Sequence, residues 1–160
     1  MIDLYTQKTQ TWKDNWNDVI RYVLFKDTLL KELLLLPEPT TIVQFVDKYF
    51  VQDEAGSEIL TDEKVRIVYC DTRGKDTGNK GVRIHYKEFD IFVRDDVLHN
   101  ATDDRLQNRY DLIADRLKYL LLRDRNVCGL HFEFEDEYNL WTKTIGYRRY
   151  HVVFSYKTTV

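Results

Sequence analysis

The hydrophobic period of this chain changes from about 3.6 residues to two near Lys64, and this change constrains the fold more than any other feature. From Lys13 to Leu36, apolar residues recur at three- and four-residue spacing, which predicts helix. Asp27 interrupts the pattern, so we expect a break there, with Asp27 as the N-cap of a second, short helix. Pro37 and Pro39 end the helical segment.

The segment from Thr41 to Val51 carries two conflicting patterns. Thr41 and Gln44 have the spacing of a capping box, which predicts the start of a helix. The β-branched and aromatic residues that follow favour a strand equally. Both interpretations stay open at this point.

Two strands are expected downstream, from Lys64 to Cys70 and from Val82 to Val93, because apolar and polar residues alternate in both. The stretch between them, Asp71–Gly81, is rich in Gly and Asp and is predicted to be a long projecting loop. The apolar residues of the second strand change parity midway. A bulge or sharp twist near Lys87–Glu88 would reconcile the two halves.

A second long helix is expected to begin at Asn100 or Thr102. Asp103 and Asp104 would then lie in its first turn, where carboxylates complement the helix dipole. Its apolar stripe predicts a face packed on a sheet. The stripe comprises Leu106, Tyr110, Ile113, Leu117, Leu120 and Leu121.

The last third of the chain predicts another hairpin. Leu130–Glu135 and Tyr147–Lys157 alternate, and the stretch between them, Asp136–Gly146, is predicted to be a second long projecting loop. The whole order is an N-terminal helical segment followed by β-β-α-β-β. This order predicts an α+β fold with a mainly antiparallel sheet packed by one long amphipathic helix. We expect a single domain over residues 1–160, with residues 1–15 as an extension.

Charge and composition argue against several function classes. The chain has 24 basic and 27 acidic residues, so it lacks the overall basic character of many nucleic-acid-binding proteins. No apolar run is long enough to span a bilayer, and the N-terminus lacks a signal-peptide pattern, which predicts folding in the cytoplasm. Cys70 and Cys128 are too few for a disulfide framework, and we expect both to be buried.

One set of side chains could ligate a metal. His131, Glu133 and Glu135 share one face of a predicted strand, and such a set would suit Mn²⁺ or Zn²⁺. The solvated face of an amphipathic strand produces the same pattern, and we prefer that interpretation. We therefore predict no metal and no cofactor.

A second set is typical of a Mg²⁺-dependent nuclease. Asp71, with Glu88 or Asp90, could hold the metal beside Lys87. No general-base pattern accompanies these residues, so we predict that the chain is not an enzyme and keep the nuclease as an alternative.

The sequence indicates a protein–protein contact surface more clearly than any catalytic site. Arg, Tyr and Trp are enriched at interface hot spots, and they gather around the two predicted loops. Burying Trp141 at an interface would contribute about 2 kcal/mol per subunit. The alternative, in which Trp141 packs against its own core, stays open. The candidate interface residues are Asp71, Arg73, Lys75, Asp76, Asn79, Lys80, Tyr138, Trp141, Lys143, Arg148 and Arg149.

Three stretches resemble the neck proteins of tailed bacteriophages, the group of tail-terminator, tail-completion and head–tail joining proteins. The resemblance consists of patterns of residue size and polarity, and it covers most of the chain after about residue 18. The stretches are Leu33–Pro37 running into Thr41–Phe45, then Tyr86–Val93, and finally Asp136–Tyr138 through Tyr150–Phe154.

The resemblance implies a structural virion protein that forms a ring, often a homohexamer, at the head–tail junction. Such a ring joins or terminates the tail and helps to seal the DNA channel. The implied partners are copies of the chain, neighbouring neck, portal-adaptor, tail-tube or sheath proteins, and genomic DNA that passes without sequence-specific binding. The implied location is the virion, after assembly in the host cytoplasm. A monomeric cytoplasmic adaptor is the remaining alternative.

Overall fold

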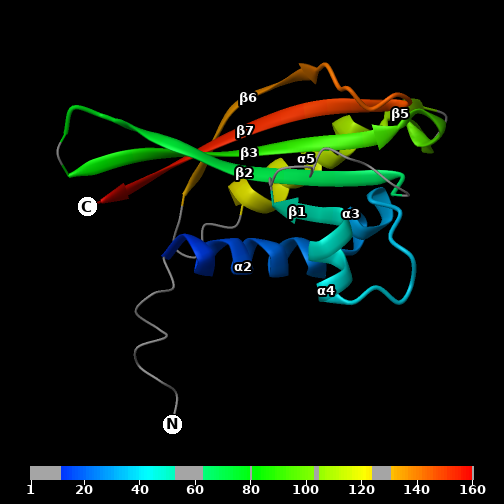
Figure 1. The fold of residues 1–160 in the computed structure, drawn as a ribbon, viewed down its shortest axis with the longest axis horizontal. Helices are drawn as coiled ribbons and strands as arrows, with labels where there is room; N and C mark the ends of the chain where they lie inside the picture. The colour runs from blue at the N-terminus through cyan, green and yellow to red at the C-terminus, as the bar shows by residue number, and fades with distance from the viewer. Residues whose placement is uncertain (1–11, 53–62, 80, 103–104, 124–130, 160) are drawn as a thin grey trace, which may run out of the picture.

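A long five-stranded sheet with helices packed against one face forms the centre of the fold (Figure 1). The computed structural model describes residues 12–52, 63–79, 81–102, 105–123 and 131–159. The sheet consists of β1 (Phe50–Gln52), β2 (Val65–Asp76), β3 (Val82–Arg94), β6 (Phe132–Leu140) and β7 (Tyr147–Thr159), in the order β1-β2-β3-β7-β6. A separate two-stranded sheet pairs β4 (His99–Thr102) with β5 (Arg105–Asn108).

The α+β class predicted from the sequence is confirmed, and the sheet is mixed. β1 runs parallel to β2, whereas the other neighbours in the main sheet are antiparallel. The helices are α2 (Trp12–Lys26), α3 (Thr28–Leu33), α4 (Ile42–Gln44) and α5 (Arg109–Arg123). None of the helices within the described ranges is long and apolar enough to cross a membrane.

Asp27 breaks the N-terminal helical segment, as the sequence predicts. Its side chain caps α3 by accepting a hydrogen bond from the backbone N–H of Leu30 at 2.7 Å. The same carboxylate pairs with Arg116 of α5, with an Nη2–Oδ2 distance of 2.5 Å. One short acidic side chain therefore starts α3 and also ties it to α5.

The segment from Thr41 to Val51 contains both a helix start and a strand, the two alternatives that its sequence left open. Thr41 and Gln44 form the predicted capping box of α4, and a π-helical turn over Phe45–Tyr49 follows. The chain then becomes the short strand β1, whose Phe50 is fully buried. A helix start and a strand thus lie within eleven residues of each other.

The predicted loop at Asp71–Gly81 is wrong over its first half, because β2 continues to Asp76 and the turn is confined to the residues after it. Pairing with β3 holds this stretch extended despite its Gly and Asp content. The irregularity in the register lies between Thr72 and Lys75 of β2, and not near Lys87–Glu88 as expected.

β3 has no bulge, although its apolar residues change parity midway. In the half where the apolar residues face away from the core, polar residues occupy the core-facing positions. Register with β7 is continuous from Val82 to Arg94. His85 and Lys87 share a face with Phe89 and are buried with it. The sheet therefore keeps one regular strand at its centre and buries a lysine in doing so.

Helix α5 begins at Arg109, and the predicted start at Asn100 or Thr102 is wrong. The chain first forms the β4–β5 pair, so Leu106 lies in β5 and not on the helical stripe, while Asp103 and Asp104 lie outside the described residues. Tertiary contacts fix the start of the helix. The backbone N–H of Arg109 donates to Leu98 O at 2.7 Å, and its side chain donates to the carbonyl oxygens of Val97 and Leu33.

One core fills the space between the helices and the sheet. Its α5 members Ile113, Leu117 and Leu121 come from the predicted stripe. The sheet contributes aromatic residues whose rings meet edge to face, as between Phe89 and Phe154 at 5.7 Å. Other members include Ile20, Leu24, Leu30, Phe45, Phe50, Ile67, Tyr69, Ile91, Phe132 and Val152.

Candidate protein-interaction surface

The turn that joins β6 to β7 exposes two large apolar side chains. Trp141 is 76% exposed and Ile145 is 97% exposed. The predicted loop at Asp136–Gly146 is wrong over its first half, because β6 continues to Leu140 and only the last six residues form the turn. The alternative in which Trp141 packs against its own core is therefore also wrong. Two large apolar side chains exposed on one turn make this turn the candidate interaction surface.

The turn is anchored to the body of the protein at its second end. The carbonyl of Gly146, a residue with φ of 82°, accepts a hydrogen bond from the backbone N–H of Asp95 at 2.8 Å. The Tyr147 hydroxyl donates to the carbonyl of Glu63 at 2.8 Å. Arg148 pairs with the Asp95 carboxylate at 3.1 Å. These contacts fix the second end of the turn on the body of the protein.

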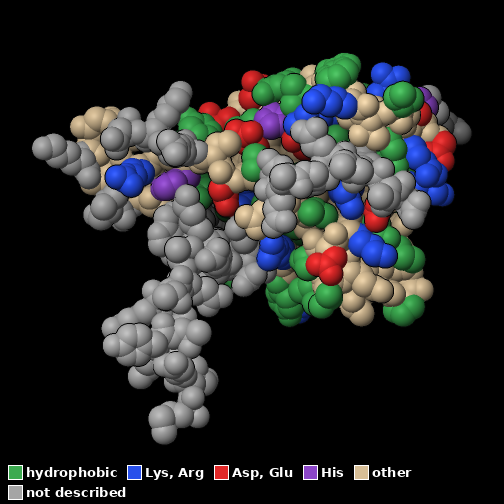
Figure 2. Space-filling view, viewed as in Figure 1, with side chains coloured by type: hydrophobic (Ala, Val, Ile, Leu, Met, Phe, Trp, Pro, Cys, Tyr) green, Lys and Arg blue, Asp and Glu red, His purple; other side chains and the backbone are tan. Residues whose placement is uncertain are grey.

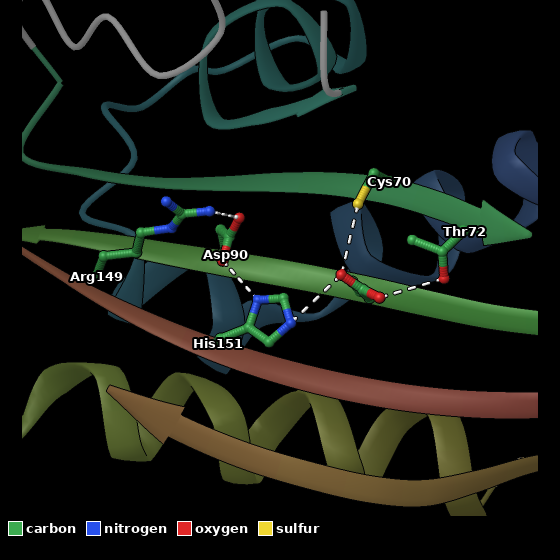
Figure 3. Close-up of polar contacts among 6 residues, drawn as sticks. Cys70, Thr72, Asp90, Arg149 and His151 are labelled. Atoms are coloured by element: carbon green, nitrogen blue, oxygen red, sulfur yellow. Dashed lines mark hydrogen bonds and ion pairs between the residues drawn. The ribbon is translucent and has the colours of Figure 1, made fainter. Parts of the chain in front are cut away.

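A network of polar side chains connects β3 and β7 on the face of the sheet opposite the core (Figure 3). Asp90 alternates with the buried Phe89 and so lies on the face opposite the core. Its two carboxylate oxygens contact His151 Nδ1 and Arg149 Nη2, each at 2.7 Å. Both partners belong to β7, so the network ties β7 to β3.

Glu88 extends this network towards β2. Its carboxylate lies 3.4 Å from His151 Nε2 and accepts a hydrogen bond from the Thr72 hydroxyl at 3.2 Å. The Cys70 sulfur lies 4.0 Å from the same carboxylate (Figure 3). Cys70 is only half-buried, so the expectation of a buried cysteine is wrong for this residue, and Cys128 lies outside the described residues.

The Asp90 carboxylate is kept charged by its partners. Burial alone would raise its pKa, but hydrogen bonds from His151 and Arg149, with their charges, hold the pKa below the usual value of 3.8. A carboxyl group whose pKa is lower in the folded state stabilises the fold above its ordinary pKa. That contribution is lost as the pH falls through the folded-state pKa.

We expect Asp90→Asn to lower the free energy of unfolding by about 1–2 kcal/mol at pH 7, because it removes two charge-assisted hydrogen bonds. Below about pH 4 the wild type loses the same contribution, so the two stability curves should converge. Urea unfolding at several pH values measures the difference. Asp47→Asn, at an exposed position, is the matched control. A difference in unfolding free energy between wild type and Asp90→Asn that stays constant down to pH 2 would contradict the stabilising role of the Asp90 charge.

The residues of the proposed nuclease site are not brought together. Lys87 and Asp71 form an ion pair of 3.0 Å on the core-facing side of the sheet. Glu88 and Asp90 lie on the opposite side, in the network with His151. The sheet therefore separates the lysine from the two carboxylates with which it was grouped.

The second candidate set, His131, Glu133 and Glu135, is also dispersed. His131 precedes β6 and is exposed. Glu133 lies 3.4 Å from Lys157, and Glu135 accepts a hydrogen bond from Ser155. Within the part of the chain that the structure describes, no three His, Cys, Asp or Glu side chains are grouped so that they could hold a metal ion.

The other predicted interface residues fall into two groups. Tyr138, Lys143 and Arg148 are exposed on β6, on the turn and at the start of β7. Asp71 and Arg149 instead hold Lys87 and Asp90 and contribute to the fold. Asn79 is exposed in the β2–β3 turn, the backbones of Arg73, Lys75 and Asp76 lie in β2, and Lys80 lies outside the described residues.

Sequence reasoning missed Ile145 and Phe134, which is 41% exposed on β6. Ile145 could have been found, because it is an isolated aliphatic residue in a polar turn, like Trp141. Phe134 could not, because its alternation with acidic residues predicts burial on the core-facing side. The exposed surface therefore extends from the turn along β6.

Comparisons with known proteins add no family to this description. No protein-family model matches the sequence, and a search of the curated proteins finds no match.

Proposed function

We propose that this chain is a structural, ring-forming subunit that binds neighbouring protein subunits through the β6–β7 turn. The observation that carries the proposal is the exposure of Trp141 and Ile145 on a turn that is already anchored. An aromatic anchor on a pre-organised support is typical of interface hot spots. Burying one such side chain contributes about 1.5–3 kcal/mol, and the contribution is repeated at every contact of a ring.

We further propose that the ring belongs to the neck of a tailed bacteriophage, as a homohexamer at the head–tail junction of the virion. The resemblance of three stretches to tail-terminator, tail-completion and head–tail joining proteins supports this proposal. Two of them map to β3 and to the β6–β7 hairpin that carries the exposed turn. The net charge of −3 suits a channel through which DNA slides without binding. The chain would act without catalysis, beside portal-adaptor, tail-tube or sheath proteins.

Native mass spectrometry of the free protein and imaging of the assembled particle test the ring. We expect a particle of several subunits, each of 19.3 kDa, in at least one of the two settings. A strict monomer in both would contradict the proposal. DNA cleavage that needs Mg²⁺ and is lost in Glu88→Ala would replace it with the nuclease alternative.

Trp141→Ala tests the contact itself. We expect the variant to melt within about 2 °C of the wild type, because removing an exposed side chain changes stability by less than about 0.5 kcal/mol. We expect assembly to weaken at least about 10-fold, since a buried aromatic anchor would be lost from every contact. Sedimentation velocity and thermal unfolding measure the two effects. Lys143→Ala, in the same turn, is the control and should assemble normally.

A lower melting temperature with normal assembly for Trp141→Ala would contradict the proposed contact. A stable complex of one copy with one different protein, lost in the same variant, would instead identify the monomeric adaptor.

A further inference from the structure

A pocket of about 520 Å³, which we call the α3 pocket, opens where the chain leaves α3 and runs towards α4. Its apolar lining comes from Leu36, Pro37 and Pro39. Pockets of about 300–1,000 Å³ hold ligand-sized groups, so this one has room for an indole ring. The polar residues that line it are Thr28, Lys31, Glu32, Glu38 and Thr40.

The end of α3 shapes this pocket. The backbone N–H groups of Leu35 and Leu36 donate to the carbonyl oxygens of Glu32 and Lys31, each at 3.1 Å, and so close the helix. Leu35 has a φ of 55°, a left-handed conformation that glycine usually adopts at a helix end. The side chain of Leu35 is nevertheless large, apolar and exposed. The chain therefore presents apolar surface directly before the pocket, at a position where glycine would cause less strain.

The rim of the α3 pocket is acidic. Glu32 and Glu38 are both exposed, and neither carboxylate has an ion-pair partner among the described residues. Lys31 is the basic residue of the lining, and its ammonium lies 4.2 Å from the centre of the Phe25 ring. Two uncompensated carboxylates beside an apolar lining suit a partner that is both apolar and basic.

The β6–β7 turn of the same chain has the complementary shape and charge. Trp141 and Ile145 are its two most exposed apolar side chains. Lys143 lies between them, is exposed, and pairs with no carboxylate in the part of the chain that the structure describes. A protruding apolar pair with one cation thus matches a concave apolar lining with two anions.

The turn cannot reach the pocket of its own chain. α3 and α4 precede β1 at one edge of the sheet, whereas the turn follows β6 at the other edge (Figure 1). Four strand spacings of about 4.8 Å separate these edges, and the turn is anchored to Asp95. Hydrophobic side chains lie at the surface of both regions, over β6 and over α4 (Figure 2). A second copy of the chain can bring the two surfaces together.

We propose that Trp141 of one subunit inserts into the α3 pocket of a second copy, with Lys143 facing Glu32 and Glu38 across the contact. This inference rests on the proposed function, for which it names the surface that the exposed turn binds. The contact joins two different surfaces of identical subunits, and such contacts close into a ring when the rotation permits. The buried indole supplies most of the affinity, and the charges select the partner surface. Truncation of Lys143 alone has little effect, because an exposed ion pair contributes little affinity.

Two full-length variants, each lacking one of the two surfaces, test the contact. Trp141→Ala removes the anchor of the turn. Thr28→Trp fills the α3 pocket, because Thr28 lines it and is exposed. Each variant alone should assemble at least about 10-fold more weakly than the wild type. Their equimolar mixture should form a dimer with one copy of each and grow no further, because only one intact turn and one intact pocket remain. Native mass spectrometry identifies the two chains.

Nuclear magnetic resonance of this mixture locates the bound surface. ¹⁵N-labelled Trp141→Ala supplies the intact pocket, so its amide signals over residues 28–40 should shift when unlabelled Thr28→Trp is added. Leu122→Trp is the matched control, because Leu122 is exposed on α5 and does not line the pocket. This control should assemble like the wild type. Thermal unfolding shows whether each variant is folded.

Charge reversal is a second test, which leaves the apolar groups in place and does not depend on Thr28→Trp. Lys143→Glu should weaken assembly at least about 5-fold, because it places like charges across the contact. Glu32→Lys with Glu38→Lys should do the same. The chain that carries all three substitutions should assemble within about 3-fold of the wild type, since each reversed turn then meets a reversed pocket.

Several results would overturn the inference and leave the proposed function intact. Folded Thr28→Trp could assemble normally while Trp141→Ala does not, which would mean that the turn binds another surface. The mixture could form no dimer, or the shifted signals could lie outside residues 28–40. The triple charge variant could stay as weak as Lys143→Glu. A wild type that is monomeric both free at millimolar concentration and on the particle would overturn the inference and the proposed function together.

Discussion

Phe50→Ala is expected to lower the free energy of unfolding by about 3–5 kcal/mol. Phe50 is fully buried and lies where the helical segment meets the sheet. Its ring is stacked on Tyr69 at 4.6 Å and on Phe45 at 5.8 Å, and it contacts Phe89 at 6.0 Å. The substitution therefore removes three aromatic contacts and leaves a cavity among them.

The surroundings of Phe50 leave little room to close that cavity. Tyr69 and Phe89 are fixed by ladder pairing within β2 and β3. β1 has only three residues, and its described ladder pairing is limited to β2. A site that cannot collapse shows the full cost of a large-to-small change.

Chemical unfolding of the purified variant measures this effect. Val43→Ala is the control, because Val43 belongs to the neighbouring α4 and is 62% exposed. Its expected change is within about 0.5 kcal/mol. Phe50→Leu should fall between the two, since it fills part of the cavity. A loss of less than about 1 kcal/mol for Phe50→Ala would contradict the central position that we assign to this ring.

Sequence patterns correctly predicted the elements that depend on contacts between residues close together in the chain. The break at Asp27 and the capping box at Thr41 depend on side chains that bond to backbone only three residues away. The stripe of α5 depends on helical spacing alone. Each of these features needs no knowledge of distant segments.

The elements that sequence analysis missed depend on distant partners. β2 extends through Gly74 because β3 pairs with it, and α5 starts late because Leu98 and Val97 bind Arg109. The features of the candidate surface also divide into those that the sequence could show and those that it could not. Trp141 was found because a large aromatic residue stands out in a polar turn. The sequence could not show that β1 and β6 are the outer strands of the sheet, because this depends on the strand order.

The charged pair Lys87–Asp71 shows how far tertiary structure overrides such patterns. Lys87 lies on the core-facing side of β3 with only 3% of its side chain exposed, and its ammonium is 4.9 Å from the centre of the Tyr69 ring. Burial lowers the pKa of Lys87, while the charge and hydrogen bond of Asp71 oppose that shift. Sequence analysis placed Asp71 in a long projecting loop as an interface residue. The structure makes it the carboxylate that keeps a buried lysine charged.

Asp71→Ala is therefore expected to lower the free energy of unfolding by about 3 kcal/mol at pH 7, since it leaves a buried ammonium without its nearest carboxylate. The Lys87 pKa in the folded state should fall further below the usual 10.5. The unfolded state then binds more protons than the folded state, so stability rises with pH. The deficit of the variant should shrink between pH 7 and pH 10, as the folded protein holds Lys87 neutral.

Lys87→Met provides the decisive comparison, because methionine fills a similar volume without a charge. The double variant Asp71→Ala/Lys87→Met should regain most of the lost stability, since a buried ion pair replaced by apolar groups is often neutral or stabilising by about 1–4 kcal/mol. Asp96→Ala, in an exposed pair with Arg94, should leave the free energy of unfolding unchanged. If the double variant were no more stable than Asp71→Ala, the loss would come from the packing of Asp71 and not from a stranded charge. The pH dependence would then vanish as well, because no proton would be exchanged on unfolding at that position.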